Sequence, residues 1–535
     1  MKNKFIYLSI LAVAGLVSCE PEFENAVDAN YTAGEADFSS YVAVGNSLTA
    51  GYMDGTMYKS GQANSFPNLL SQQFATVGGG AFTQPSYEED VNNLGGIAGV
   101  PGFGTRRVIN FATSAPENIT GTPTITLTAQ ATAYNNMGVP GAKSFHLLAP
   151  GYGNPAGLAL GQANPYYVRH ATSATSTVLG DAMSKNPTFF TNWIGANDIL
   201  SYATTGGIGV DQTGNPNPLT YGPNDITDPT VFAGVYSLII NGGTHPAFGT
   251  VTGLAQNGAK GVVATIPSVT SIPFFTTVPY NALPAEATLS AVPLYGFLAQ
   301  VTGGRILPLS SAAGSKNPIL IVDETLADIS SQLTPAFTQF ITQYLMQTSN
   351  PPITLAQAQA QATAIAPSVA QLYGRARQAN SGDLILLTSS GKIGKPNSAG
   401  IAPFNVNGVT FPFQDGDVLI PSEQTAIANA TNTYNMAIKS IAASKNLAVA
   451  DMNFILNGLV GGLRSVDGSI YTANYFSGAA TENKVLFSLD GVHPNARGYA
   501  VISNEIIKVI NAHYKSNIPF LNPSYFPGIN VVATN

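Results

Sequence analysis

Charged residues are scarce in this chain. They make up 10% of its 535 residues, against about 25% in an average soluble protein. Acidic residues outnumber basic ones by 29 to 22, the formal net charge is -7, and no run of Lys or Arg exceeds a pair. Because binding of nucleic acid requires a basic surface, the sequence excludes nucleic acid as a partner. The hydrophobic content of 44% is still ample for a buried core, which excludes a disordered chain.

Cysteine is almost absent as well. With one cysteine in the whole chain, neither an internal disulfide nor a cysteine-ligated metal centre can form. The five histidines are scattered, and none belongs to a His-Glu-x-x-His or His-x-His pattern. They are His146, His170, His245, His493 and His513. The sequence therefore predicts neither a bound metal nor a cofactor.

The one cysteine, Cys19, stands at the end of a secretion signal. Lys2 and Lys4 precede an apolar run over residues 5–17. That run is shorter than the roughly 20 residues of a membrane span, but it has the length and the basic flank of a signal peptide. The following Leu16-Val17-Ser18-Cys19 resembles the lipobox of bacterial lipoproteins.

This resemblance implies a lipid anchor. Residues 1–18 would be removed, Cys19 would be lipidated, and residues 19–36 would form a tether to the folded part. More than one acyl chain on Cys19 would be enough for stable attachment to a membrane. The acidic stretch 20–24 resembles the signal by which some Gram-negative bacteria send lipoproteins to the outer surface. We therefore expect a cell-envelope protein held in the outer membrane, with the membrane face left open.

Four short apolar runs in the remaining chain have the character of buried strands. Patterns typical of helices lie before the third and the fourth run and after Pro494. Near-continuous apolar strands that are joined by helices are typical of a parallel sheet covered on both faces. The sequence thus predicts an α/β protein with strands at 41–45, 188–195, 261–267 and 447–451 and helices at 231–260, 422–445 and beyond 494.

Two short patterns at the ends of these elements could carry out chemistry. Ser47 follows the first strand in a Gly-x-Ser turn, where a hydroxyl is exposed as a nucleophile requires. Asp490 precedes His493 by one turn of chain, just before the last helix. A carboxylate at that spacing can accept a hydrogen bond from one imidazole nitrogen and leave the other nitrogen to act as a base.

Together with two further patterns, these resemble the four sequence blocks of the SGNH (GDSL-type) hydrolase family. The blocks occur in the order that the family requires, each at the end of an expected strand or in the loop that follows. They are Gly45-Asn46-Ser47-Leu48, Asn136-Met137-Gly138-Val139-Pro140-Gly141, Gly195-Ala196-Asn197-Asp198 and Asp490-Gly491-Val492-His493.

The resemblance assigns a role to each block. Ser47 would be the nucleophile, His493 the base and Asp490 its orienting acid. The oxyanion hole would consist of the Ser47 and Gly141 N–H groups and the Asn197 amide, with Gly138 as an alternative to Gly141. The family fold is a flavodoxin-like, three-layer α/β/α parallel sheet. We expect this core at 37–275 and 422–535, with a large insertion at 276–421 that could act as a cap.

Some residues depart from this pattern or are interpreted as structural. Asn46 stands where the family usually has Asp, and an amide keeps the hydrogen-bonding reach of the carboxylate while losing its charge. We expect Asp198 to start a helix and Trp193 to lie in the core. The adjacent Arg106 and Arg107 are interpreted as a solvated pair.

The sequence therefore predicts a lipid-anchored serine hydrolase that cleaves carboxylic esters through an acyl-enzyme. Its substrate class stays open between acyl lipids and acylated glycans. The alternative is a catalytically silent surface lipoprotein that binds a glycan or a lipid in the same cleft. The presence of all four blocks favours the enzyme, because a binding module has no need for the complete set.

Overall fold

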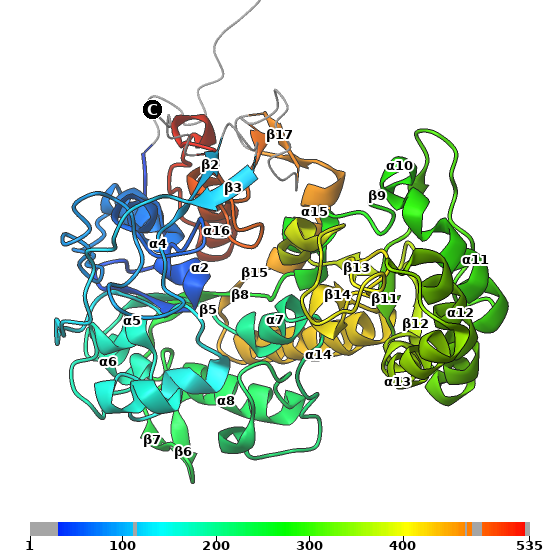
Figure 1. Cartoon of the computed structure of the whole chain (residues 1–535). Coiled ribbons are helices and arrows are strands. Elements are labelled where there is room, and N and C mark those ends of the chain that lie inside the picture. The colour runs from blue at the N-terminus through cyan, green and yellow to red at the C-terminus, as the bar shows by residue number, and fades with distance from the viewer. Residues whose placement is uncertain (1–29, 111–114, 466–467, 473–483, 530–535) are drawn as a thin grey trace, which may run out of the picture.

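The computed structural model describes residues 30–110, 115–465, 468–472 and 484–529 (Figure 1). The predicted signal peptide, the predicted lipidation site Cys19 and the tether up to residue 29 lie outside the described residues. Among the described residues, no helix has both the length and the apolar character that a membrane span requires.

A parallel sheet of five strands lies at the centre of the protein, in the order β15-β8-β5-β1-β4. The four predicted strands are confirmed, and β4 is a further short strand that the apolar pattern did not predict. The strands are β1 (Tyr41–Gly45), β4 (Asn136–Gly138), β5 (Phe189–Trp193), β8 (Lys260–Ala264) and β15 (Ala448–Ala450). The protein is thus a mixed α/β protein built on a parallel sheet.

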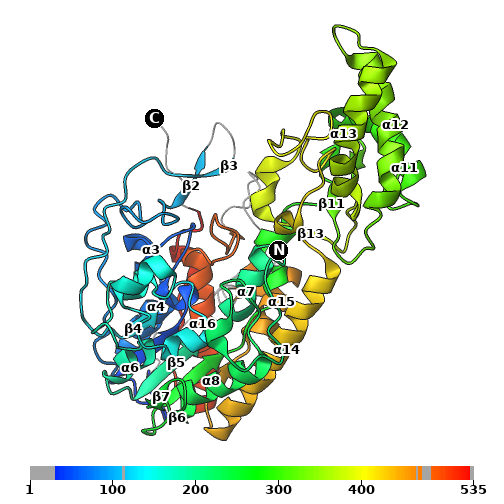
Figure 2. The same cartoon turned by 60° about the horizontal axis from the view of Figure 1, so that its bottom comes forward.

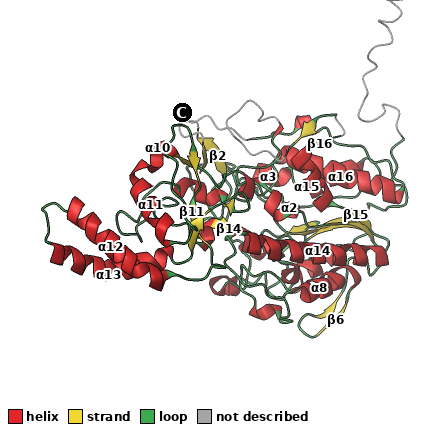
Figure 3. Ribbon diagram, turned by 90° about the vertical axis from the view of Figure 1, so that its right-hand side faces the viewer, coloured by secondary structure: helices red, strands yellow, loops and turns green. Residues whose placement is uncertain are grey.

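Helices cover both faces of this sheet. Alternate residues of a strand point to opposite faces, so the strands pack against helices on both sides. Val42 and Val44 of β1 pack on the side of α6 (Val178–Met183), α8 (Pro229–Asn241) and α14 (Pro421–Ser444). Tyr41 and Ala43 pack on the side of α4 (Phe66–Ala75) and α16 (Ala496–Tyr514). In Figure 3, β15 accordingly runs between α14 and α16.

The predicted helices are confirmed at 422–445 and after residue 494, and one prediction is wrong in length. The helix expected over 231–260 ends at Asn241, because Gly242 takes a φ of 72° that a helix does not allow. The chain then forms the hairpin β6 (Gly243–His245) and β7 (Gly249–Val251). The shorter helices are α2 (Ser47–Ala50), α3 (Lys59–Ala63), α5 (Pro165–Val168), α7 (Asn197–Thr204), α9 (Pro273–Thr276), α10 (Ala285–Thr288) and α15 (Met452–Gly461).

The predicted insertion at 276–421 has an apolar core of its own. It contains α11 (Val292–Val301), the hairpin of α12 (Ser330–Thr348) and α13 (Leu355–Tyr373), and three small antiparallel pairs. The pairs are β9 (Leu283–Pro284) with β10 (Lys316–Asn317), β11 (Leu320–Val322) with β12 (Ala376–Gln378), and β13 (Leu384–Ile385) with β14 (Val418–Leu419). The α12–α13 hairpin points away from the sheet (Figure 2). Outside this hairpin, Leu387 of the insertion packs on Gly491. The role of the insertion as a cap stays a prediction.

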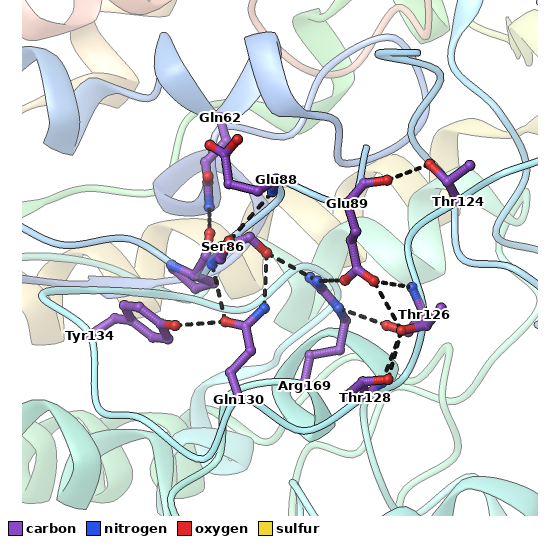
Figure 4. Close-up of polar contacts among 11 residues, drawn as sticks. Gln62, Ser86, Glu88, Glu89, Thr124, Thr126, Thr128, Gln130, Tyr134 and Arg169 are labelled. Atoms are coloured by element: carbon purple, nitrogen blue, oxygen red, sulfur yellow. Dashed lines mark hydrogen bonds and ion pairs between the residues drawn. The ribbon is translucent and has the colours of Figure 1, made fainter. Parts of the chain in front are cut away.

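The long connection between α4 and β4 has little regular structure, and the buried Arg169 holds much of it in place (Figure 4). Its guanidinium forms an ion pair with Glu89 at 2.5 Å and donates to the carbonyl oxygens of Thr126 at 2.9 Å and Ser86 at 3.0 Å. This connection also contains the antiparallel pair of β2 (Arg107–Asn110) and β3 (Ala115–Asn118). Elsewhere in the chain, β16 (Leu463–Arg464) and β17 (Ile470–Tyr471) form another small pair. One buried cation therefore orders a loop that the sequence shows only as rich in Gly, Asn and Thr.

Candidate active site

Three of the four sequence blocks meet at the carboxyl edge of the sheet. Gly45, the last residue of β1, lies opposite Trp193 of β5 and Gly138 of β4 in the strand register. The residues that follow these strands, among them Ser47 and Asn197, therefore emerge at the same edge. In open α/β sheets this edge is where ligands bind.

Ser47 is the first residue of the short helix α2, directly after a tight turn. The side chain of Asn46 caps this helix, because its Oδ1 accepts a hydrogen bond from the Leu48 N–H at 3.1 Å. An amide oxygen makes this bond as a carboxylate would, so Asn46 keeps the shape of the turn without adding a charge. A side chain at Gly45 would collide with Thr49, since a Cβ there would lie 2.1 Å from the threonine hydroxyl.

Ser47, His493 and Asp490 form a continuous hydrogen-bonded chain. The Ser47 Oγ lies 2.9 Å from His493 Nε2, and His493 Nδ1 lies 2.9 Å from Asp490 Oδ2. All three side chains are largely buried. Nucleophile, base and orienting acid take this arrangement in serine hydrolases.

Asp490 is held as a carboxylate. Its Oδ1 accepts hydrogen bonds from the N–H groups of Val492 and His493, both at 2.8 Å. Burial acts to raise the pKa of Asp490, but His493 and these backbone donors lower that pKa well below its ordinary value. An ionised Asp490 can accept the Nδ1–H of His493, which leaves Nε2 free to take a proton from Ser47.

The loop at residues 54 and 55 supports the acid, and the sequence analysis did not single it out. The Gly55 N–H donates to Asp490 Oδ2 at 3.0 Å, and Asp54 Oδ1 accepts from the Leu489 N–H at 3.0 Å. The Asp54 N–H also donates to Ser488 Oγ at 3.0 Å. Both residues of the loop have positive φ angles, 54° and 85°. The Asp-Gly pair soon after the first block is a turn signal that could have pointed to this loop.

The imidazole of His493 is fixed from a second side. The ring of Tyr52 lies against it, with 4.6 Å between the ring centroids. The Tyr52 carbonyl in turn accepts a hydrogen bond from the Tyr499 hydroxyl at 2.7 Å, which connects this segment to α16. Asn495 caps α16 by accepting from the Gly498 N–H at 2.9 Å, so the helix begins just after His493. The base is thus held between the end of α2 and the start of α16.

Asn197 lies next to the turn that contains Gly141. Asn197 begins α7, and its Nδ2 donates to the carbonyl oxygen of Ala142 at 2.9 Å, one residue after Gly141. Asn197, Ser47 and His493 line the same cleft, whose volume is about 380 Å³. Asn197 thus shares a cleft with Ser47 and is bonded to the residue that follows Gly141.

Gly138, the alternative to Gly141, has a packing role. It is the last residue of β4, and a Cβ there would lie 2.3 Å from the Ala50 backbone nitrogen of α2. Asn136 bonds the same helix, because its Nδ2 donates to the Thr49 carbonyl at 3.0 Å. The Gly138 N–H already donates to Asn136 Oδ1 at 3.0 Å, whereas Gly141, with a φ of 81°, lies in the turn that Asn197 contacts.

Removing the Asn197 amide tests the oxyanion site. Asn197→Ala should lower kcat for an ester by about 10²–10³-fold, as the loss of one oxyanion donor does. KM should change little, because the donor acts on charge that develops in the transition state. The control is Ser201→Ala, one turn further along α7, which should keep the wild-type kcat. A variant at Asn197 that raised KM alone would contradict the assignment.

The structure agrees with the interpretation of Asp198 as a helix-start residue and disagrees with the interpretation of Arg106 as a solvated side chain. Asp198 does start a helix, and its buried carboxylate accepts from the N–H and the hydroxyl of Ser144 at 2.8 and 2.7 Å. The interpretation as part of a solvated pair is wrong for Arg106, because its side chain is buried and donates to the Asn93 carbonyl at 2.8 Å. The Asn93 carbonyl and the nearby Tyr58 ring replace the solvent there.

A group of three carboxylates lies apart from this site, at the junction of the insertion with α14. Single oxygens of Glu324, Asp415 and Glu423 lie within 4.8 Å of one another. Burial, together with repulsion from the two other acids, raises the pKa of Glu423 to about 8. Burial and like charge thus disfavour the ionised form of Glu423 in this group.

Comparison of the chain with models of protein families, with curated proteins and with solved structures found no match. A parallel α/β sheet by itself does not specify a reaction, since the same fold class carries many unrelated activities. The geometry of the candidate site is therefore the basis for inferring a function.

Proposed function

We propose that this protein is a serine hydrolase that cleaves carboxylic esters, of the SGNH type. The observation that carries the proposal is the hydrogen-bonded chain from Ser47 through His493 to Asp490, with 2.9 Å at each contact of the imidazole. Asn197 lines the same cleft, and its amide is the kind of side-chain donor that stabilises an oxyanion.

The topology of the sheet supports the same proposal. Numbered along the chain, the five parallel strands have the spatial order 2-1-3-4-5, which is the flavodoxin-like order. In such sheets the ligand site lies where the strand order reverses, here between β1 and β5. Ser47 follows β1 and Asn197 follows β5, so both candidate residues stand at that point.

In the proposed mechanism, Ser47 Oγ attacks the ester carbonyl while His493 Nε2 takes its proton. The Ser47 and Gly141 N–H groups and the Asn197 amide stabilise the oxyanion. His493 then gives the proton to the departing alcohol, and Asp490 stabilises the imidazolium meanwhile. Water hydrolyses the acyl-enzyme with His493 again as the base. Each step uses only groups of this chain and water.

Hydrolysis of an aryl acetate tests this proposal against the silent-lipoprotein alternative. The wild-type protein should turn over the ester, and the turnover should disappear in Ser47→Ala. A protein that binds a glycan or a lipid in the same cleft without catalysis would show equal background rates for both. That result would contradict the esterase and favour the silent lipoprotein.

We further propose that the protein is attached to the outer membrane through lipidated Cys19, which would place the site near the ester groups of the envelope. Cys19→Ala should move the protein from the membrane fraction to the soluble fraction of cells, since removal of the acyl chains removes the anchor. Fractionation followed by immunoblotting measures this. The control is Ser9→Ala inside the apolar run, which leaves the lipobox intact. A Cys19→Ala protein that still needed detergent for extraction would contradict lipid anchoring.

A further inference from the structure

A second and larger cavity lies directly beside the catalytic cleft. Together with the open space at its mouth it encloses about 640 Å³, against about 380 Å³ for the catalytic cleft counted in the same way. Residues of α15, of α16 and of the loops around Ser47 and His493 form its walls. Every residue that lines it is apolar or glycine. The one polar side-chain atom among these residues, the indole nitrogen of Trp193, is itself buried, so the cavity offers burial of hydrocarbon and no exposed side-chain donor.

The cavity adjoins the catalytic residues. It shares Leu48, Pro267, Ile272 and Val492 with the lining of the cleft that contains Ser47 and His493. Leu48 directly follows the candidate nucleophile, and Val492 directly precedes the candidate base. The wall between the two spaces therefore consists of apolar side chains, beside which a hydrocarbon chain from an ester at Ser47 would lie.

We propose that this cavity binds the hydrocarbon chain of the substrate, which makes the substrate a lipid-type ester. The inference rests on the proposed esterase activity and decides between the two substrate classes that the sequence left open. An acetyl group would leave the cavity empty. A sugar in it would lose its hydrogen bonds to water without replacement, which is costly for each buried hydroxyl.

Two series of substrates test the inference and identify which part of the ester carries the chain. The first varies the acyl group of aryl esters from acetyl to octanoyl, and the second varies the alkyl group of acetate esters over the same lengths. Burial of each methylene should raise kcat/KM roughly two- to fourfold. Along one of the two series we therefore expect a total rise of about 10²–10³.

The single tryptophan of the chain gives a readout that is independent of catalysis. Trp193 is the one tryptophan in the sequence, and its buried side chain lines the cavity. A dodecanoate with a terminal bromine should quench the Trp193 fluorescence of the inactive Ser47→Ala protein in a saturable manner. Unbrominated dodecanoate should compete for the same site, and bromoacetate should have no such effect.

Two substitutions on α15 provide a matched pair. Leu456 is half-buried and lines the cavity, whereas Phe454 on the same helix is 75% exposed and does not line it. Leu456→Trp fills part of the space, so the ratio of kcat/KM between the longest and the shortest ester of the series that shows the rise should fall about tenfold or more, as the loss of room for two or three methylenes implies. Phe454→Trp should keep the wild-type ratio.

The outcomes separate this inference from the proposed function. Hydrolysis that depends on Ser47, with no rise along either series and no quenching, would overturn the chain-binding cavity and leave the esterase intact. Quenching without any hydrolysis would overturn the esterase and leave a lipid-binding protein. If Leu456→Trp does not fold, the quenching of Trp193 in the Ser47→Ala protein still decides.

Discussion

Ser47→Ala and His493→Ala should each lower kcat for ester hydrolysis by about 10⁴–10⁶-fold, because nucleophile and base act as one unit. The 2.9 Å contact between Ser47 Oγ and His493 Nε2 is the structural basis of this expectation. For the same reason, the double variant should lose little more than either single variant. Steady-state kinetics of the three variants on one aryl ester measure the effect.

Matched substitutions outside the site control for general damage. Ser71→Ala on α4 and His245→Ala in the β6–β7 hairpin remove the same groups at partly exposed positions, and both should keep the wild-type kcat. Losses in the single variants that simply multiplied in the double variant would mean that the two residues act independently. Turnover of Ser47→Ala at the wild-type rate would contradict the mechanism altogether.

Asp490→Asn should lower kcat by about 10⁴-fold while leaving the fold intact. The amide keeps the size of the carboxylate, and its oxygen in the place of Oδ1 can still accept the N–H groups of Val492 and His493. It can no longer stabilise the imidazolium, and its NH₂ group can favour the wrong tautomer of His493. Kinetics and thermal unfolding of the variant, measured together, separate this effect from instability.

The pH dependence gives a second check on Asp490. Because the pKa of Asp490 lies well below its ordinary value, the carboxylate stays ionised through the range around pH 4 where an ordinary Asp is protonated. Its contribution to stability is likewise present above that range and is lost only as the pH falls through the lowered pKa.

Loss of less than about tenfold in kcat for Asp490→Asn would contradict its role as the orienting acid.

The apolar runs of the sequence predicted four of the five central strands, because each run is long enough to be recognised. β4 was missed as a strand since it consists of only Asn136, Met137 and Gly138, and it is stabilised by its pairing with β1 rather than by local preference. The helix over 231–260 was predicted too long, because the apolar pattern does not show where the helix ends. Apolar residues continue after Asn241, but the backbone turn at Gly242 is a property of a single residue.

The candidate site could be predicted where its residues form short patterns, and not where they meet only in space. The spacing of Asp490 and His493 already implied their contact, and Ser47 belonged to a recognisable turn. The support of Asp490 by Gly55 joins segments that are 435 residues apart, and no local pattern records such a contact. The apolar cavity is another example, since residues such as Leu48 and Leu456 become its walls only after folding.

The most direct test of the central claim is covalent labelling with a fluorophosphonate, which reacts with a serine only when a base activates its hydroxyl. Digestion and mass spectrometry of the labelled protein locate the adduct. We expect one adduct, on the peptide that contains Ser47, and its loss in both Ser47→Ala and His493→Ala. An unlabelled wild-type protein, or an adduct on a different serine with Ser47 unmodified, would contradict the account.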